Sequence, residues 1–320
     1  MKTKSFAIAS RRSPLAQAQT RQIQILLSDA LGVGSEERDL VLPIETFVTA
    51  GDKNLSGSLA EIGGKGLFTK EIEEALLSGA ARFAVHSMKD MPAQSPEGLV
   101  TAAIPPREDP SDCFLSFLAR DPWELPENAR IGAASVRRIA QILHRRPDLK
   151  PQTLRGNVGT RLEKLKDGEA DATFLALAGL KRLGLAQEAV KIMPPEEMLP
   201  AVGQGALCIQ AHADDKEALA LAAKISCANS TLCVALERSF LAALDGSCRT
   251  PIAGLAVLDD GNVWFRGELL SLDGADRFCV ERRFSLDTDD IKSVEECGLE
   301  AAQELRAKAG AEFMKKIQQL

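Results

Sequence analysis

The sequence predicts an α/β protein with two lobes, followed by a small α+β domain at the C-terminal end. Strand-like and helix-like segments alternate along two stretches of the chain, one before and one after a proline-rich break at 105–110. Beyond about residue 225, three strand-like runs lie between two helical ones, which is typical of an antiparallel sheet. The length of 320 residues is about twice that of one average domain and agrees with several domains.

The first lobe is expected to begin with a short apolar strand at 5–9 that leads directly into a helix. Ser13 is a typical N-cap residue and Pro14 suits the first helical position, so we expect a helix from Leu15 to Leu31 that ends at Gly32. The other elements expected here are a strand at 39–48, a glycine-rich loop at 51–66, a helix at 67–78 and a strand at 82–86.

The second lobe is expected to repeat this alternation. Its strands are predicted at 129–133, 151–154 and 171–175, and its helices at 136–146, 158–167 and 176–183. A second break, at 193–200, precedes a strand at 203–211. The last part is predicted as a helix at 229–244, strands at 251–258, 262–271 and 276–285, and a helix from about 288. Two lobes joined through two breaks predict a ligand cleft between them.

Composition argues against several classes of protein. There are 39 basic and 45 acidic residues, and aromatic residues are only 4% with no Tyr, which argues against a nucleic-acid partner. The apolar run at 6–9 is too short for an export signal, and no run approaches the ~18 apolar residues of a membrane span. Seven cysteines without a C-x-x-C pair indicate reduced thiols, so we expect a cytoplasmic protein without a membrane partner.

The strongest charge anomaly is a basic segment at 130–161 that holds eight basic residues and one acid. Ser135 is an expected N-cap, and Arg137 and Arg138 fall in the first helical turn, where cations oppose the helix dipole unless an anion binds there. Arg155 lies between a strand and a helix start. We therefore predict a polyanion-binding surface, with a solvated face as the alternative. Arg145 and Arg146 are expected to face solvent.

Two short segments carry other candidate chemistry. Ser87, Lys89 and Asp90 follow a predicted strand, where α/β proteins place ligand groups, although a solvated surface turn is the alternative. Cys248 lies in a Gly/Pro loop beside Arg249, which would lower the pKa of its thiol. The glycine clusters at 63–66 and 203–205 match neither a phosphate loop nor a dinucleotide fingerprint, and three scattered histidines predict no metal site.

A run of longer motifs resembles the porphobilinogen deaminase (hydroxymethylbilane synthase) family. The motifs are IASRRSPLA at 8–16, GGKGLF at 63–68, VHSMKD at 85–90, REDP at 107–110, SVRR at 135–138, LRGNVGTR at 154–161, AGLKRLG at 178–184, LPAVGQG at 199–205, and Cys248 with Pro251. They occur in the order of the family and cover residues 8 to about 252. Several are individually rare, so the resemblance is specific.

The resemblance implies two lobes similar to type II periplasmic-binding proteins and three domains. Domain 1 comprises 1–105 and 201–222, domain 2 comprises 106–200, and domain 3 comprises 223–320. It also implies that the chain condenses four porphobilinogen molecules head to tail, each losing ammonia, into hydroxymethylbilane for tetrapyrrole biosynthesis. A dipyrromethane cofactor would be held by a thioether to Cys248. The resemblance further implies a monomer, the usual state in the family, whose product passes to uroporphyrinogen-III synthase.

The resemblance also assigns site residues. The catalytic residues would be Asp90 and Arg11. The cofactor-binding residues would be Ser87, Lys89, Asp90, Ser135, Arg137, Arg138 and Cys248. The substrate-binding residues would be Arg11, Ser13, Lys65, Arg155, Arg161, Arg182 and Gln204. We expect the arginines to face one cleft between the lobes, because every pyrrole ring carries two carboxylates. Without the resemblance, the alternative is a non-catalytic two-lobed protein that binds a carboxylated metabolite.

Overall fold

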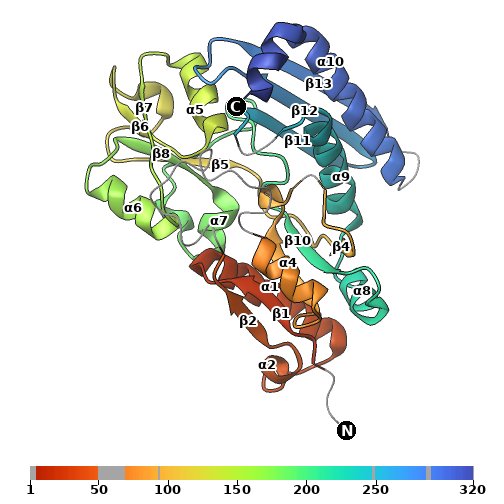
Figure 1. Ribbon diagram of the computed structural model, residues 1–320. Helices are drawn as coiled ribbons and strands as arrows, with labels where there is room; N and C mark the ends of the chain where they lie inside the picture. The colour runs from red at the N-terminus through yellow and green to blue at the C-terminus, as the bar shows by residue number, and fades with distance from the viewer. Residues whose placement is uncertain (1–4, 50–68, 93, 247–248, 286–289, 320) are drawn as a thin grey trace. The chain divides into compact units, whose positions relative to one another are not determined.

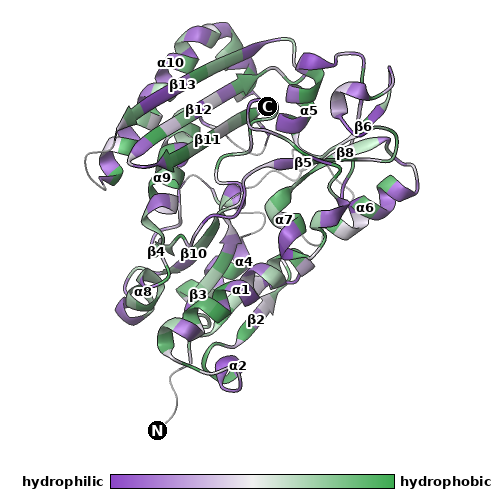
Figure 2. Ribbon diagram, turned by 180° about the vertical axis from the view of Figure 1, so that it is seen from behind, coloured by the Kyte–Doolittle hydropathy of each residue, from purple (hydrophilic) through white to green (hydrophobic). Residues whose placement is uncertain are grey.

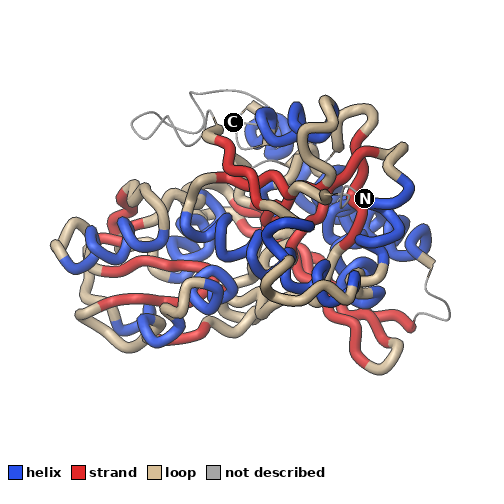
Figure 3. The backbone as a smooth tube through the Cα atoms, turned by 90° about the horizontal axis from the view of Figure 1, so that it is seen from below, coloured by secondary structure: helices blue, strands red, loops and turns tan. Residues whose placement is uncertain are grey.

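The computed structural model describes residues 5–49, 69–92, 94–246, 249–285 and 290–319. The chain divides into two compact units. Unit 1 comprises Met1–Arg107 and Ala206–Thr231, and unit 2 comprises Glu108–Gly205 and Leu232–Leu320. Figure 3 shows the backbone with its helices in blue and its strands in red. Each unit is described below by itself.

Unit 1 is built on a five-stranded mixed sheet with the order β2-β1-β3-β10-β4 (Figure 1). The strands are β1 Ile8–Arg11, β2 Ile44–Phe47, β3 Phe83–Ser87, β4 Leu99–Ala103 and β10 Leu207–His212. β1 runs parallel to both of its neighbours, and β10 runs antiparallel to β3 and β4. The strand that returns to unit 1 late in the chain is therefore the one that reverses direction.

Helices cover both faces of this sheet. They are α1 Pro14–Leu31, α2 Arg38–Val41, α4 Lys70–Leu77 and α8 Lys216–Ala223, with a 3-10 turn η1 at Met88–Asp90. One face packs Ile23 and Leu27 of α1 and Leu221 of α8 against the sheet. The opposite face packs Ile72 and Leu76 of α4 against small strand residues. This three-layer core fixes the strand ends that carry the candidate site.

Unit 2 contains a second five-stranded sheet, with the order β7-β6-β8-β5-β9. The strands are β5 Asp112–Ser116, β6 Arg130–Gly132, β7 Lys150–Gln152, β8 Ala172–Ala176 and β9 Lys191–Ile192. The helices are α5 Val136–Arg145, α6 Val158–Lys166 and α7 Leu177–Arg182, with 3-10 turns η2 Pro122–Glu124 and η3 Ala186–Glu188. β6 is parallel to β7 and β8, and β5 is antiparallel to β8 and β9. The two sheets thus share one strand pattern.

The C-terminal part of unit 2 is an antiparallel sheet packed against two helices. Its elements are α9 Ala228–Ala243, which begins within unit 1, β11 Ile252–Asp259, β12 Asn262–Leu270, β13 Arg277–Ser285 and α10 Ile291–Gln318. Phe240 of α9 lies 5.1 Å from the ring of Phe265, and a Cβ at Gly267 would overlap the Phe240 ring. In Figure 2, α10 shows both hydrophobic (green) and hydrophilic (purple) stretches, as a helix with one buried side should.

The predicted fold class is confirmed, since two mixed α/β sheets are followed by a small antiparallel sheet with helices. The strand predicted at 39–48 is wrong in its first half, because Arg38–Val41 forms a helical turn. Sequence reasoning also missed β4, β5, β9 and α8. Among the described residues, no single helix is long and apolar enough to cross a membrane. Of the helices in this part of the chain, only α8 and α9 taken together reach the required length and hydropathy, and they are bent by 108° relative to each other.

Candidate functional site

Arg11 is the last residue of β1, and the start of α1 fixes its backbone. Gln17 donates a hydrogen bond from Nε2 to the carbonyl oxygen of Arg11 at 2.6 Å. Ser13 caps the helix by accepting a hydrogen bond from the amide of Ala16 at 3.3 Å. Thr20 Oγ1 donates to Ser10 Oγ at 2.6 Å, one residue before Arg11. The residues that start the helix therefore also hold the arginine.

Asp90 reaches the same place from the end of β3. The strand ends at Ser87, and the 3-10 turn Met88–Asp90 follows directly. Met88 is buried and donates its amide to the carbonyl of Ala206 at 3.0 Å, which anchors the turn beside the start of β10. Gln19 of α1 donates from Nε2 to Ser87 Oγ at 2.7 Å, so α1 and β3 are tied together beside the site.

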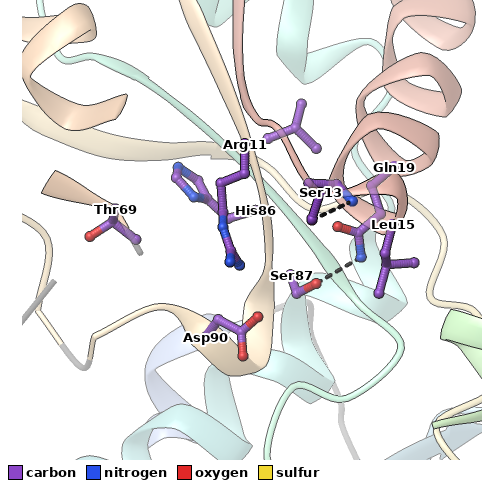
Figure 4. A pocket seen from close by; sticks show the side chains of 10 residues that line it. Arg11, Ser13, Leu15, Gln19, Thr69, His86, Ser87 and Asp90 are labelled. Carbon is purple, nitrogen blue, oxygen red and sulfur yellow. Dashed lines mark hydrogen bonds between the residues drawn. The ribbon is translucent and has the colours of Figure 1, made fainter. Parts of the chain in front are cut away.

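Arg11, Ser13, Ser87 and Asp90 line one cavity of unit 1, with a volume of about 50 Å³. Figure 4 shows the Arg11 side chain running past His86, with its guanidinium pointing toward the exposed carboxylate of Asp90. At 10–15 Å³ for each water, this space holds roughly a few water molecules. The cavity can therefore take a small polar group, such as one carboxylate or a pyrrole N–H, between a cation and an anion.

Two other groups of this cavity are buried polar atoms. His86 Nε2 and Thr69 Oγ1 are buried and have no hydrogen-bond partner among the described residues. Burial lowers the pKa of His86 to about 4, and the charge of Arg11 adds to this effect. His86 is therefore neutral near pH 7 and adds no charge beside Arg11.

The buried His86 predicts a specific loss of stability in acid. The unfolded chain protonates this histidine near pH 6.5, whereas the folded chain does so only near pH 4. Protons thus bind the unfolded state preferentially between these values, and the free energy of unfolding falls as the pH falls, by roughly 3 kcal/mol in total. Urea unfolding between pH 7 and pH 4 measures this slope.

His86→Gln should flatten that slope, because the group that titrates differently in the two states is gone. His212→Gln is the matched control, since it changes a histidine on β10 of the same unit without removing a buried imidazole. Equal slopes for the wild-type protein and His86→Gln would contradict the prediction.

In unit 2, Arg137 and Arg138 lie in the first turn of α5 and are 4% and 5% exposed. Asp112, the first residue of β5, is 0% exposed and pairs with both. The distances are 2.8 Å from Arg137 Nη1 to Asp112 Oδ2 and 2.7 Å from Arg138 Nη2 to Asp112 Oδ1. Burial alone would raise the pKa of Asp112, but the two guanidinium charges outweigh burial and hold that pKa well below its usual range.

Gln204 belongs to the same cluster. Its Nε2 donates to Asp112 Oδ1 at 2.8 Å and to the carbonyl of Pro110 at 2.7 Å. Arg137 also donates to the carbonyl of Leu199 at 2.7 Å, and Arg138 donates to the carbonyl of Phe174 at 2.8 Å. These contacts join α5, β5 and the 199–205 segment into one buried network.

The remaining predicted residues of unit 2 are Ser135, Arg155, Arg161 and Arg182. Ser135 is the half-buried N-cap of α5, without a capping bond from its side chain. Arg161 donates from Nε to the carbonyl of Gly156 at 2.8 Å, next to the half-buried Arg155. Arg182 donates to the carbonyl of Gly205 at 2.9 Å, and burial lowers its pKa against the opposing charge of Glu108.

Three further expectations can be placed. Lys89 is half-buried in the turn before Asp90. Arg145 is exposed, with its guanidinium carbon 3.7 Å from the centre of the Trp123 ring. The expectation that Arg146 faces solvent is wrong, because its side chain is 16% exposed, pairs with Asp148 and donates to loop carbonyls. Lys65 and Cys248 lie outside the described residues.

Arg11, Ser13, Ser87 and Asp90 therefore lie together in unit 1, and Arg137, Arg138 and Gln204 lie together in unit 2. Whether they face one shared cleft stays a prediction, as does the division into three domains. Sequence reasoning missed Asp112, although one signal was available: this acid opens the otherwise apolar run Asp112-Cys113-Phe114-Leu115. Among the described residues, no group of three or more His, Cys, Asp or Glu could hold a metal ion.

Comparison with known proteins gives matches over nearly the whole chain. The family model "Porphobilinogen deaminase, dipyromethane cofactor binding domain" matches residues 6–220, and the model of the "Porphobilinogen deaminase, C-terminal domain" matches 231–307. A porphobilinogen deaminase of Caulobacter vibrioides is 48% identical over 308 residues, which are 95% of each chain. A chloroplastic porphobilinogen deaminase of Oryza sativa is 45% identical, covering 99% of this chain and 87% of the relative.

Matches to solved structures are weaker. A putative methionine-binding lipoprotein of Bacillus subtilis has a TM-score of 0.42 and 13% identity, covering 69% of this chain and 90% of that one. The level of identity to the Caulobacter vibrioides and Oryza sativa proteins, together with both family models, establishes the family. The chain belongs to the porphobilinogen deaminase family.

Proposed function

We propose that Asp90 and Arg11 form the catalytic centre of this enzyme. As a member of its family, the chain forms hydroxymethylbilane from porphobilinogen in tetrapyrrole biosynthesis. The observation that carries the assignment is that Asp90 and Arg11, from two different strand ends, line one cavity with Ser13 and Ser87 (Figure 4). A carboxylate and a guanidinium at one small cavity suit a substrate that develops positive charge and carries negative side groups.

The chemistry requires a fixed anion. When porphobilinogen loses ammonia, the positive charge that remains spreads onto its pyrrole nitrogen. The carboxylate of Asp90, held by the turn at the end of β3, can stabilise that charge and accept a proton as the new carbon–carbon bond forms. Arg11 can bind a substrate carboxylate and orient Asp90 at the same time. His86 is neutral near pH 7, so it leaves the charge balance of the cavity unchanged.

The residues present fit a dipyrromethane cofactor, the group named by the matching family model. Two guanidinium groups against the single carboxylate of Asp112 leave one positive charge in a buried place, which favours binding an anion. Arg137, Arg138 and Ser135 would hold cofactor carboxylates, and Ser87, Lys89 and Asp90 would face its pyrrole nitrogens. When bound, this group supplies the pyrrole carbon to which the next unit is joined.

The substrate rings would be held by the other basic and polar groups of the site. Those we propose are Lys65, Arg155, Arg161, Arg182, Ser13 and Gln204. Each charge-assisted bond from arginine to a carboxylate contributes about 1.5–3 kcal/mol. The amide of Gln204 already contacts Asp112 and Pro110, so its effect on the substrate is expected to pass through the arginines beside it.

Further parts of the proposal concern the molecule as a whole. We propose a cytoplasmic monomer of three domains that hands its product to uroporphyrinogen-III synthase. The match of one family model to 6–220 and of another to 231–307 supports a separate C-terminal domain. An intact-mass spectrum of the purified protein tests the function: an enzyme with the cofactor carries a covalent two-pyrrole increment, whereas a two-lobed binding protein has the mass of the bare chain.

Arg138→Leu, or Arg137→Leu, should impair assembly of the cofactor. Loss of one charge-assisted contact weakens binding of the first two pyrroles by roughly tenfold to a hundredfold. The measurement is the fraction of chains that acquire the two-pyrrole increment when apoprotein is mixed with porphobilinogen. Arg145→Leu is the matched control, since this arginine lies on the same helix but is exposed. Normal increments in both buried-arginine variants would remove these residues from the site.

A further inference from the structure

We infer that Asp112 is a positioning residue for cofactor assembly: it holds Arg137 and Arg138 in the orientation that receives the cofactor carboxylates. The inference rests on the proposed role of those two arginines. Asp112 opens β5, the antiparallel strand beside β8, and is completely buried. Its carboxylate contacts Arg137, Arg138 and Gln204, so its proposed role needs no contact with the substrate.

The two carboxylate oxygens of Asp112 contact different arginines. Oδ2 faces Arg137 Nη1 at 2.8 Å, and Oδ1 receives Arg138 Nη2 at 2.7 Å and Arg138 Nε at 3.2 Å. Gln204 Nε2 donates to the same Oδ1 at 2.8 Å. One side chain of β5 thus fixes two side chains of α5 and one from the 199–205 segment.

The two arginines need such a partner because of where they lie. Both are in the first turn of α5, where the helix dipole repels cations. Two neighbouring guanidinium groups also repel each other, and long arginine side chains have many rotamers to lose when a ligand binds. A buried carboxylate that pairs with both removes the repulsion and selects one rotamer for each before the ligand arrives.

The cluster of Asp112, Arg137 and Arg138 can still attract an anion because it carries a net positive charge. Two guanidinium charges and one carboxylate leave one positive charge. Glu268 acts on Arg137 electrostatically, but it is itself paired with Arg277. An incoming carboxylate can therefore complete the charge balance without displacing Asp112.

The third partner, Gln204, is itself held firmly. The amide of Gly203 donates to Glu237 Oε2 at 2.7 Å, and Glu237 Oε1 accepts the amide of Ala256 on β11 at 2.8 Å. Gly205 has a φ of 87°, and a Cβ there would overlap the carbonyl oxygen of Glu108. Asp112 thus contacts a segment that Glu237 links to β11, so the arginines keep their place relative to that strand.

Asp112→Asn tests the inference, since it keeps the shape and removes the charge. Apoprotein of the variant is mixed with porphobilinogen, and the rate of appearance of the two-pyrrole increment is followed by intact mass. We expect this rate to fall at least tenfold. In the double variant with Arg138→Leu, the loss in free energy should be smaller than the sum of the two single losses, because Asp112 acts in part through Arg138.

Asp171→Asn is the matched control, because it breaks another Asp–Arg pair of the same sheet, Asp171 with Arg130 at 2.7 Å. It should assemble cofactor at the wild-type rate. If Asp112→Asn does not fold, Asp112→Glu keeps the charge and displaces it by one methylene, and we expect severalfold slower assembly from a folded protein. Wild-type assembly in whichever Asp112 variant folds, or losses that add in the double variant, would overturn the inference. If instead Arg138→Leu alone has no effect, the proposed role of the arginines fails.

Discussion

Asp90→Asn should lower the rate of pyrrole condensation by about 10²- to 10⁴-fold while leaving the protein folded. Asparagine has nearly the size of aspartate, so the turn Met88–Asp90 and its anchor on Ala206 should survive. What disappears is the negative charge that faces Arg11 across the cavity (Figure 4). An amide neither stabilises a developing cation nor accepts its proton.

The measurement separates chemistry from assembly. Intact mass should still show the two-pyrrole increment on the purified variant, while single-turnover addition of porphobilinogen becomes slow. A fall in kcat with little change in KM would place the lost interaction in the transition state. Asp214→Asn is the control, since this carboxylate of unit 1 is 94% exposed and should not affect turnover. Near-normal turnover of Asp90→Asn would show that Asp90 is a residue of a surface turn.

The unit 1 site could be predicted from the sequence because local signals determine it. Ser13 and Pro14 mark the start of a helix and Gly32 its end, and the structure has α1 at Pro14–Leu31 with Gly32 as the C-cap. The apolar run before Ser87 indicates a strand, so the polar residues that follow were expected at the C-terminal end of that strand. Short-range rules therefore place both Arg11 and Asp90 at strand ends.

The unit 2 cluster could not be predicted in the same way, because its contacts join distant parts of the chain. Asp112 meets Arg138 across 26 positions and Gln204 across 92. These contacts depend on β5 pairing with β8 in an antiparallel register, and the sequence pattern did not reveal β5 at all. The basic residues at 130–161 suggested a polyanion-binding surface, whereas the structure buries two of them against an acid. Burial of charge depends on tertiary pairing, which no local pattern encodes.

We expect the cofactor to be attached between α9 and β11, and the structure describes the residues on either side of 247–248. Gly246 donates its amide to the carbonyl of Leu241 at 3.0 Å, and a Cβ at this position would overlap the Leu241 side chain. On the other side, Ile252 donates to the carbonyl of Thr250 at 2.8 Å as β11 begins. Cys248 itself lies outside the described residues. These hydrogen bonds on either side of Cys248 suit an attachment point that must stay in place while the pyrrole chain grows at its far end.

Cys248→Ala should yield a protein without the two-pyrrole increment and without activity. The thiolate of Cys248 is expected to attack the methylene carbon of porphobilinogen as ammonia leaves, forming the thioether on which condensation begins, and no other side chain replaces it. Cys227 provides the sharpest control. Burial would raise the pKa of Cys227, but hydrogen bonds from Ser230 and Asn229 outweigh burial and lower it, so this thiol is the natural competitor. Cys227→Ala should keep both increment and turnover, and peptide mapping should place the increment on the Cys248 peptide. An increment on Cys227, or full turnover without Cys248, would mean that the pyrrole chain is not built on this loop.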